Sequence, residues 1–95
     1  MQKCVIYVRE NTQPDIYQQF NECARYASRY GLSIEYKVFD SRGDRLQEAI
    51  NKAVFTNDIT DFIVYSRKAM CDDMEEMLFH HIYMTHFGVN VHFID

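Results

Sequence analysis

The sequence predicts an α/β fold, a three-layer sandwich in which a four-stranded parallel sheet lies between layers of helices. Two observations predict it. Short apolar runs alternate along the chain with longer segments whose apolar residues recur at helical spacing, which is the pattern of βαβ units. Two of the runs, within Lys3–Thr12 and Phe62–Tyr65, are apolar on both faces, as in strands inside a covered parallel sheet. At 95 residues the chain predicts one domain, 1–95.

The first half of the chain contains two predicted strands and the helix between them. Lys3–Thr12 holds an apolar, β-branched run that is too short for a helix, and it predicts a central strand. A helix is predicted over Asp15–Tyr30, because Pro14 and an acidic residue suit a first turn and Gly31 suits a helix end. Leu32–Phe39 alternates apolar with polar residues, which indicates an edge strand with one polar face.

The second half continues the alternation. Its predicted segments are a helix over Arg45–Phe55, a connector over Thr56–Asp61, an interior strand over Phe62–Tyr65, a loop beginning at Ser66, a helix from about Asp73 to Phe87, and a strand over Val89–Ile94. Right-handed βαβ connections join strands of this kind. With the first and third strands interior and the second at an edge, the predicted order is 2-1-3-4.

Composition restricts the classes of function. Fourteen acidic against ten basic residues give a net charge of -4, which argues against a surface devoted to nucleic acid, so DNA is a weak candidate partner. The odd number of cysteines, three, favours a reduced, cytoplasmic protein. No apolar run has transmembrane length, so we expect no membrane contact. The histidines lack a recognised metal spacing, and no cofactor or metal is predicted.

Basic residues follow three of the predicted strands. The carboxyl ends of parallel strands meet at one edge of a sheet, so these residues predict an anion site there. The candidates are Arg9, Arg42, Arg45, Arg67 and Lys68. The alternative interpretation of Arg9 is a rim arginine that binds no anion and pairs with Glu10, Asp40 or Asp44.

Several segments carry a family resemblance. Tyr7-Val8-Arg9-Glu10-Asn11-Thr12, followed by a helix with Gln19, is similar to the Tyr-x-Arg-x-Ser-Ser/Thr motif that ends the first strand of the serine recombinase (resolvase/invertase) catalytic domain. Arg45-Leu46-Gln47-Glu48-Ala49 resembles that family's Arg-Pro-Gly-Leu-Gln-x-Leu segment. Ile63-Val64-Tyr65, Asp73-Met74-Glu75-Glu76-Met77-Leu78 and the final strand resemble its later elements. The resemblance implies a resolvase-like fold and a role in DNA recombination.

The departures from the family pattern predict a degenerate site with no catalytic residues. The resemblance places the family's nucleophilic serine at Asn11, whose amide cannot attack a phosphodiester, and its glutamine at Asp15. It places two phosphate-binding arginines at Ala69 and Asp72, and an aspartate at Lys68. Only Arg9 and Arg45 remain of the cations that would stabilise the transition state. Asn11 also has a simpler interpretation, as a helix-capping amide.

The last helix and the thiol before it have two interpretations each. The helix is apolar around most of its circumference, which indicates either core packing or a partner surface, with Met74, Met77, Phe79, Tyr83 and Met84 as candidates for the surface. Cys71 at its start is either a reactive thiol or a half-buried inert one.

Three functions remain open from the sequence. The first is a catalytically inactive serine-recombinase-like domain of a mobile element, an interaction module that associates with itself, as a homo-oligomer, or with another recombinase. The second is an active phosphoryl-transfer domain with Thr12 or Ser41 as a displaced nucleophile. The third is a small-anion or nucleotide binder at the basic rim, although no glycine-rich phosphate loop follows any strand.

Overall fold

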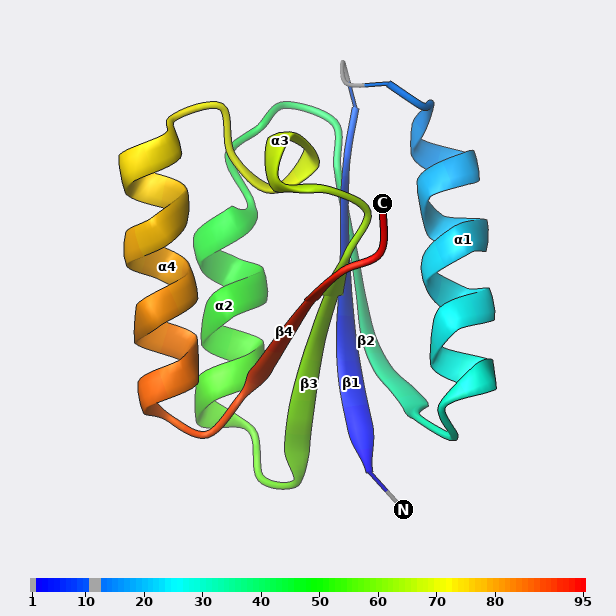
Figure 1. Cartoon of the computed structure of the whole chain (residues 1–95), viewed down its shortest axis with the longest axis vertical. Coiled ribbons are helices and arrows are strands. Elements are labelled where there is room, and N and C mark those ends of the chain that lie inside the picture. Colours follow the sequence, from blue (N-terminus) through cyan, green and yellow to red (C-terminus); the bar gives the residue numbers. More distant parts are fainter. Residues whose placement is uncertain (1, 11–12) are drawn as a thin grey trace.

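The computed structural model describes residues 2–10 and 13–95, and it confirms the predicted architecture (Figure 1). One sheet of four parallel strands has the order β2-β1-β3-β4, and helices cover both of its faces. The elements are β1 (Lys3–Arg9), α1 (Ile16–Arg29), β2 (Ser33–Asp40), α2 (Leu46–Phe55), β3 (Ile59–Val64), α3 (Arg67–Met70), α4 (Met74–His86) and β4 (Asn90–Phe93).

The two faces of the sheet form separate cores. On one face, alternate residues of β1 such as Val5 and Tyr7 pack with α2 and α4, and on the other face Cys4 and Ile6 pack with α1. Successive residues of a strand point to opposite faces, so a strand buried on both sides must be apolar at every position. Val5, Ile6 and Tyr7 are fully buried, as predicted for a central strand.

The apolar face of β2 differs from the prediction. The register with β1 shifts between Cys4, which pairs with Ile34, and Val5, which pairs with Tyr36. Because of this irregularity, the side chains of β2 after the shift point to the opposite face of the sheet from the one that strict alternation predicts. Ile34 therefore packs with the α1 core, whereas Tyr36 packs with the opposite core.

Two boundaries after α2 also differ from the prediction. The predicted connector over Thr56–Asp61 is partly strand, because β3 begins at Ile59, which lies opposite Lys3 of β1. The predicted loop after β3 contains the short helix α3, whose first turn is capped by the Ser66 side chain accepting from the Ala69 N–H at 3.0 Å. Ser66 can cap a helix, but serine is also common in loops, so the sequence pattern did not distinguish a short capped helix from a loop.

The apolar circumference of α4 divides into two faces. Met77 and Met84 are buried against the α2 side of the sheet, so these two candidates for a partner surface belong to the core instead. Met74 and Phe79 are exposed, as that prediction requires, and Tyr83 is half-buried. None of the helices in the described ranges is long and apolar enough to cross a bilayer.

Candidate functional site

The predicted site lies at the carboxyl edge of the sheet, at the top of Figure 1, where the segments after β1, β2 and β3 come together. A pocket of about 250 Å³ opens there. It is lined by Arg9, Gly43, Leu46, Met70, Cys71, Asp72, Asp73 and Glu76. The lining therefore brings together residues from β1, the β2–α2 loop and the α3–α4 segment.

Arg9 is held at this edge by α3 and by the segment between α3 and α4. Its guanidinium donates to both carboxylate oxygens of Asp72, at 2.9 and 3.3 Å, and to the Lys68 carbonyl oxygen at 2.6 Å. The hydrogen bond that Arg9 donates to Asp72 raises the pKa of Arg9, and the same bond lowers the pKa of Asp72. Among the carboxylates of the described residues, Arg9 pairs with Asp72, and not with Glu10, Asp40 or Asp44 as the sequence suggested.

Helix α1 fixes the backbone from which Arg9 projects. The buried Gln19 side chain accepts from the Arg9 N–H at 3.1 Å and donates to the Arg9 carbonyl oxygen at 2.8 Å. It also donates to the Pro14 carbonyl oxygen at 2.8 Å. A side-chain amide can replace a neighbouring strand in this way, because it offers one donor and one acceptor. Gln19 therefore joins α1 to the end of β1.

Asp40 organises the loop between β2 and α2. Its buried carboxylate accepts from the Tyr7 hydroxyl at 2.6 Å and from four consecutive backbone N–H groups at 2.7 to 3.2 Å, those of Arg42, Gly43, Asp44 and Arg45. Gly43 gives the shortest of the four, and its φ of 80° lies in the left-handed region that favours glycine. Burial opposes the charge of Asp40, but these hydrogen bonds outweigh it and lower its pKa.

Two of the other predicted cations, Arg45 and Arg67, contact groups outside the Arg9 pocket. The Arg45 guanidinium donates to both oxygens of Glu48, at 2.6 and 3.1 Å, and to the Phe39 carbonyl oxygen. The Arg67 guanidinium lies over the Phe93 ring, 4.7 Å from its centre. Within the described part of the chain, Arg9 is the single guanidinium in the pocket lining, beside three carboxylates. The electrostatic field of this pocket therefore does not favour an anion.

The degenerate positions have different structural roles. Asn11 and Thr12 lie outside the described residues, so the position of the family nucleophile is not seen. Ala69 is buried under the rim, and Lys68 contributes its carbonyl oxygen to Arg9. Asp72 carries a negative charge where the resemblance places an arginine. The side chain at that position neutralises Arg9 instead of adding to its charge.

Cys71 matches the inert alternative. Its side chain is half-buried, and burial is the largest of the causes that raise its pKa. A thiol with a raised pKa is a poor nucleophile at neutral pH.

Among the described residues, no group of three or more His, Cys, Asp or Glu could hold a metal ion.

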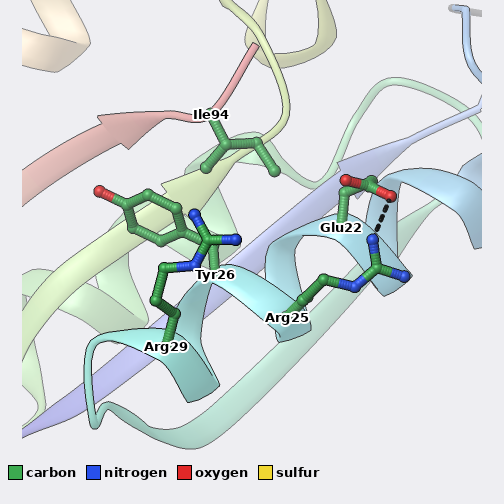
Figure 2. Close-up of a pocket in the computed structure, with 5 residues that line it drawn as sticks. All are labelled: Glu22, Arg25, Tyr26, Arg29 and Ile94. Carbon is green, nitrogen blue, oxygen red and sulfur yellow. Dashed lines mark hydrogen bonds and ion pairs between the residues drawn. The ribbon is translucent and has the colours of Figure 1, made fainter.

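A second, smaller hollow lies on the α1 side of the sheet. Figure 2 shows its lining, which is Glu22, Arg25, Tyr26, Arg29 and Ile94, around a volume of about 110 Å³. Arg25 donates to Glu22 at 3.0 Å, so one of the two arginines that line the hollow is already paired with a carboxylate. This hollow is not on the predicted rim.

Beside this hollow, three side chains form a hydrogen-bonded chain that the sequence did not reveal. The Tyr26 hydroxyl and His92 Nδ1 are 2.9 Å apart, and His92 Nε2 is 2.6 Å from the Asp61 carboxylate, which is 5% exposed. The three residues come from α1, β4 and β3. A charged residue, Asp61, directly before the apolar run Phe62–Tyr65 is the one signal that could have indicated them.

Comparison with solved structures gives the class of fold. The N-terminal catalytic domain of TP901-1 integrase superposes with a TM-score of 0.83 and 19% identity, over 98% of this chain and 77% of that one. The C-terminal catalytic domains of two IS607-like serine recombinases, ISC1926 TnpA and IS1535 TnpA, give TM-scores of 0.82 and 0.70 at 16% and 14% identity. These matches cover 98% and 97% of this chain, and 70% of each TnpA chain.

This chain therefore has the fold of a serine recombinase catalytic domain, and the resemblance predicted from its motifs is confirmed at the level of the fold. No family model matches the sequence, and no curated protein matches it.

Proposed function

We propose that this chain is a single resolvase-like domain with a role in DNA recombination, in which strand cleavage has been lost and an interaction or regulatory function remains. Its partner is a second copy or another recombinase-family protein of a mobile element. The similarity of its fold to an integrase and to two IS607-like recombinases supports the recombination setting. Its three free cysteines suit a reducing, cytoplasmic environment.

One observation carries the loss of cleavage, the ion pair between Arg9 and Asp72. Phosphoryl transfer needs several preorganised cations around the phosphorus, because negative charge accumulates on the oxygens in the transition state. Here the guanidinium of Arg9 is bound on two sides by oxygens, at 2.6 and 2.9 Å, and Arg45 is bound to Glu48. A DNA phosphate would have to displace Asp72 and would then face Asp73 and Glu76 in the same pocket.

The experiment is a cleavage assay with purified full-length protein and supercoiled plasmid DNA. A recombinase that forms a covalent protein–DNA intermediate leaves protein attached to DNA after denaturation, and an active serine recombinase assayed in parallel on its own site provides the positive control. We expect neither nicking nor attached protein from this chain. A covalent adduct that withstands denaturant would show that the chain cleaves DNA and would overturn the loss of catalysis.

A further inference from the structure

The hollow on the α1 side of the sheet is lined by two arginines that stand one helical turn apart. Arg25 and Arg29 are at positions i and i+4 of α1, so their side chains lie on the same side of the helix. Like charges at this spacing repel each other. Figure 2 shows the Arg29 guanidinium beside Tyr26 and the Arg25 guanidinium beside Glu22. An anion held between the two guanidiniums would offset their repulsion.

The two arginines differ in their contacts within the protein. Glu22 accepts a hydrogen bond from Arg25 at 3.0 Å, and its carboxylate is the one acidic group in the lining. Arg29 is exposed and makes no hydrogen bond or ion pair with residues 2–10 or 13–95. A guanidinium offers five N–H donors, and Glu22 occupies one of those of Arg25. Both arginines therefore have donors to offer to a ligand.

We propose that this hollow is a phosphate-binding site, in which Arg25 and Arg29 donate to different oxygens of one phosphate group. The charges of the two pockets favour this location. The hollow has two arginines and one carboxylate in its lining, whereas the rim pocket has one arginine and three carboxylates. The inference goes beyond the proposed function, and it places anion binding on α1 instead of on the rim.

The size of the hollow indicates the class of ligand. Its volume of about 110 Å³ is far below the roughly 300 to 1,000 Å³ of pockets that enclose a whole drug-sized molecule. The hollow therefore fits one small group at the end of a larger ligand. A phosphate group has oxygens that point in several directions and can accept from two separate guanidiniums. A carboxylate has two oxygens, and Glu22 already supplies one carboxylate to Arg25.

The walls of the hollow are fixed by contacts within the domain. The Tyr26 hydroxyl lies 2.9 Å from His92 Nδ1, and the Ile94 N–H donates to the Val64 carbonyl oxygen at 3.2 Å. Fixed walls reduce the entropy that binding costs. The arginines themselves are exposed, 67% for the Arg25 side chain, so water and salt weaken their contacts with an anion. We expect a dissociation constant for phosphate on the order of 1 mM.

The test is a titration of the full chain with inorganic phosphate at neutral pH and constant ionic strength, followed by amide NMR. The signals of residues 22–30 and of Ile94 should shift and reach saturation, and sodium chloride alone should not shift them. Arg29→Gln should weaken phosphate binding about fivefold or more. Lys52→Gln removes the same charge from α2, on the other face of the sheet, and should leave the dissociation constant unchanged. Circular dichroism confirms that each variant is folded.

A second pair of variants tests the role of the carboxylate. Glu22→Gln removes the negative charge from the lining and frees a donor of Arg25, so it should tighten phosphate binding about threefold or more. Glu35→Gln changes the net charge equally but lies beside Lys3, and it should have no such effect. Shifts confined to other residues, an Arg29→Gln protein that binds as the wild type does, or equal effects of Glu22→Gln and Glu35→Gln would overturn the proposal.

Two further ligands distinguish the source of the phosphate group. A nucleoside monophosphate and a short DNA duplex are compared at equal phosphate concentration. Shifts at residues 22–30 with the monophosphate assign a small phosphate ester, and shifts there with the duplex assign the DNA backbone. Binding of inorganic phosphate with neither of them would mean an adventitious ion only and would overturn the assignment. The DNA cleavage assay does not depend on the hollow, so the proposed loss of catalysis is judged separately.

Discussion

At the scale of single residues, the charge at position 72 controls what Arg9 can bind. The Arg9 guanidinium is mostly covered, with a side chain 13% exposed, whereas Asp72 is 73% exposed. An ion pair with so exposed a partner contributes little to the stability of the fold, because water and salt screen it. Its effect is on binding, because a bidentate carboxylate occupies the same donors that would hold a phosphate.

Asp72→Ala should therefore make the rim bind phosphate without destabilising the protein. We expect inorganic phosphate to shift the amide NMR signals of Arg9 and of residues 42–45 in the variant, and to have little effect on them in the wild type. The free energy of unfolding should change little, because Asp72 is exposed. Glu35→Ala removes another surface carboxylate, which lies 3.8 Å from Lys3, and is the control. Equal shifts in wild type and Asp72→Ala would mean that Asp72 does not block Arg9.

At the scale of elements, one buried carboxylate determines the shape of the connection between β2 and α2. Asp40 ends β2, and the N–H groups that it accepts belong to the residues that lead into α2. Tyr7 reaches the same carboxylate from β1, and burial is the largest cause that raises the Tyr7 pKa. The loop therefore depends on the ionised form of Asp40, which accepts hydrogen bonds on both oxygens.

Asp40→Asn should destabilise the protein by about 2 to 4 kcal/mol at neutral pH, because one amide N–H₂ group would face other donors. Tyr7→Phe removes a single hydrogen bond to the charged group and should cost about 1.5 to 3 kcal/mol. Urea unfolding at a series of pH values measures both effects.

The pH dependence of these variants follows from the lowered pKa of Asp40. A carboxylate with a lower pKa in the folded state adds stability that is fully present above its unfolded pKa of about 3.9. That stability is lost as pH falls through the folded value. The difference in the free energy of unfolding between wild type and Asp40→Asn should therefore become smaller below about pH 4. A difference that is independent of pH would show that the charge of Asp40 is not what holds the loop.

At the scale of the whole molecule, the two faces of the sheet are covered unequally. Helices α2 and α4 cover one face, whereas α1 is the one described helix on the other face (Figure 1). β4 is an edge strand that pairs with β3 alone. The hydrogen-bonded chain of Tyr26, His92 and Asp61 links α1 to this edge and satisfies the buried carboxylate of Asp61. These hydrogen bonds therefore hold β4, an edge strand, to the rest of the domain.

His92→Leu should cost about 2 to 3 kcal/mol, because it removes a partner from a buried carboxylate. Hydrogen exchange at the amides of β4 should accelerate more than exchange at β1, and urea unfolding gives the free energy. The double variant Asp61→Leu/His92→Leu should recover part of the loss, since no buried charge is then left unpaired. A His92→Leu protein as stable as the wild type would show that this chain of side chains does not hold the edge.

The fold could be predicted from local patterns in the sequence. The alternation of apolar runs with helical periodicity indicated the seven main elements, and the two-sided burial of β1 and β3 indicated the order 2-1-3-4. The start of α1 was predicted to within one residue, although Asp15, which was expected in the first turn, is the N-cap and accepts from the N–H groups of Tyr17 and Gln18. All of these signals depend on residues close together in the chain, and a pattern of near neighbours is visible in the sequence alone.

The tertiary structure alone decided which side chains meet. Arg9 could have paired with any of several carboxylates, and its contact with Asp72, 63 positions away, depends on where the α3–α4 segment crosses the rim. A helix apolar all round gives no periodicity from which to choose a buried side, so only packing assigned Met84 to the core and Ile82 to the surface. Local sequence determined the elements of this protein, whereas its charges and surfaces were set by contacts between distant segments, whose relative positions no short-range pattern encodes.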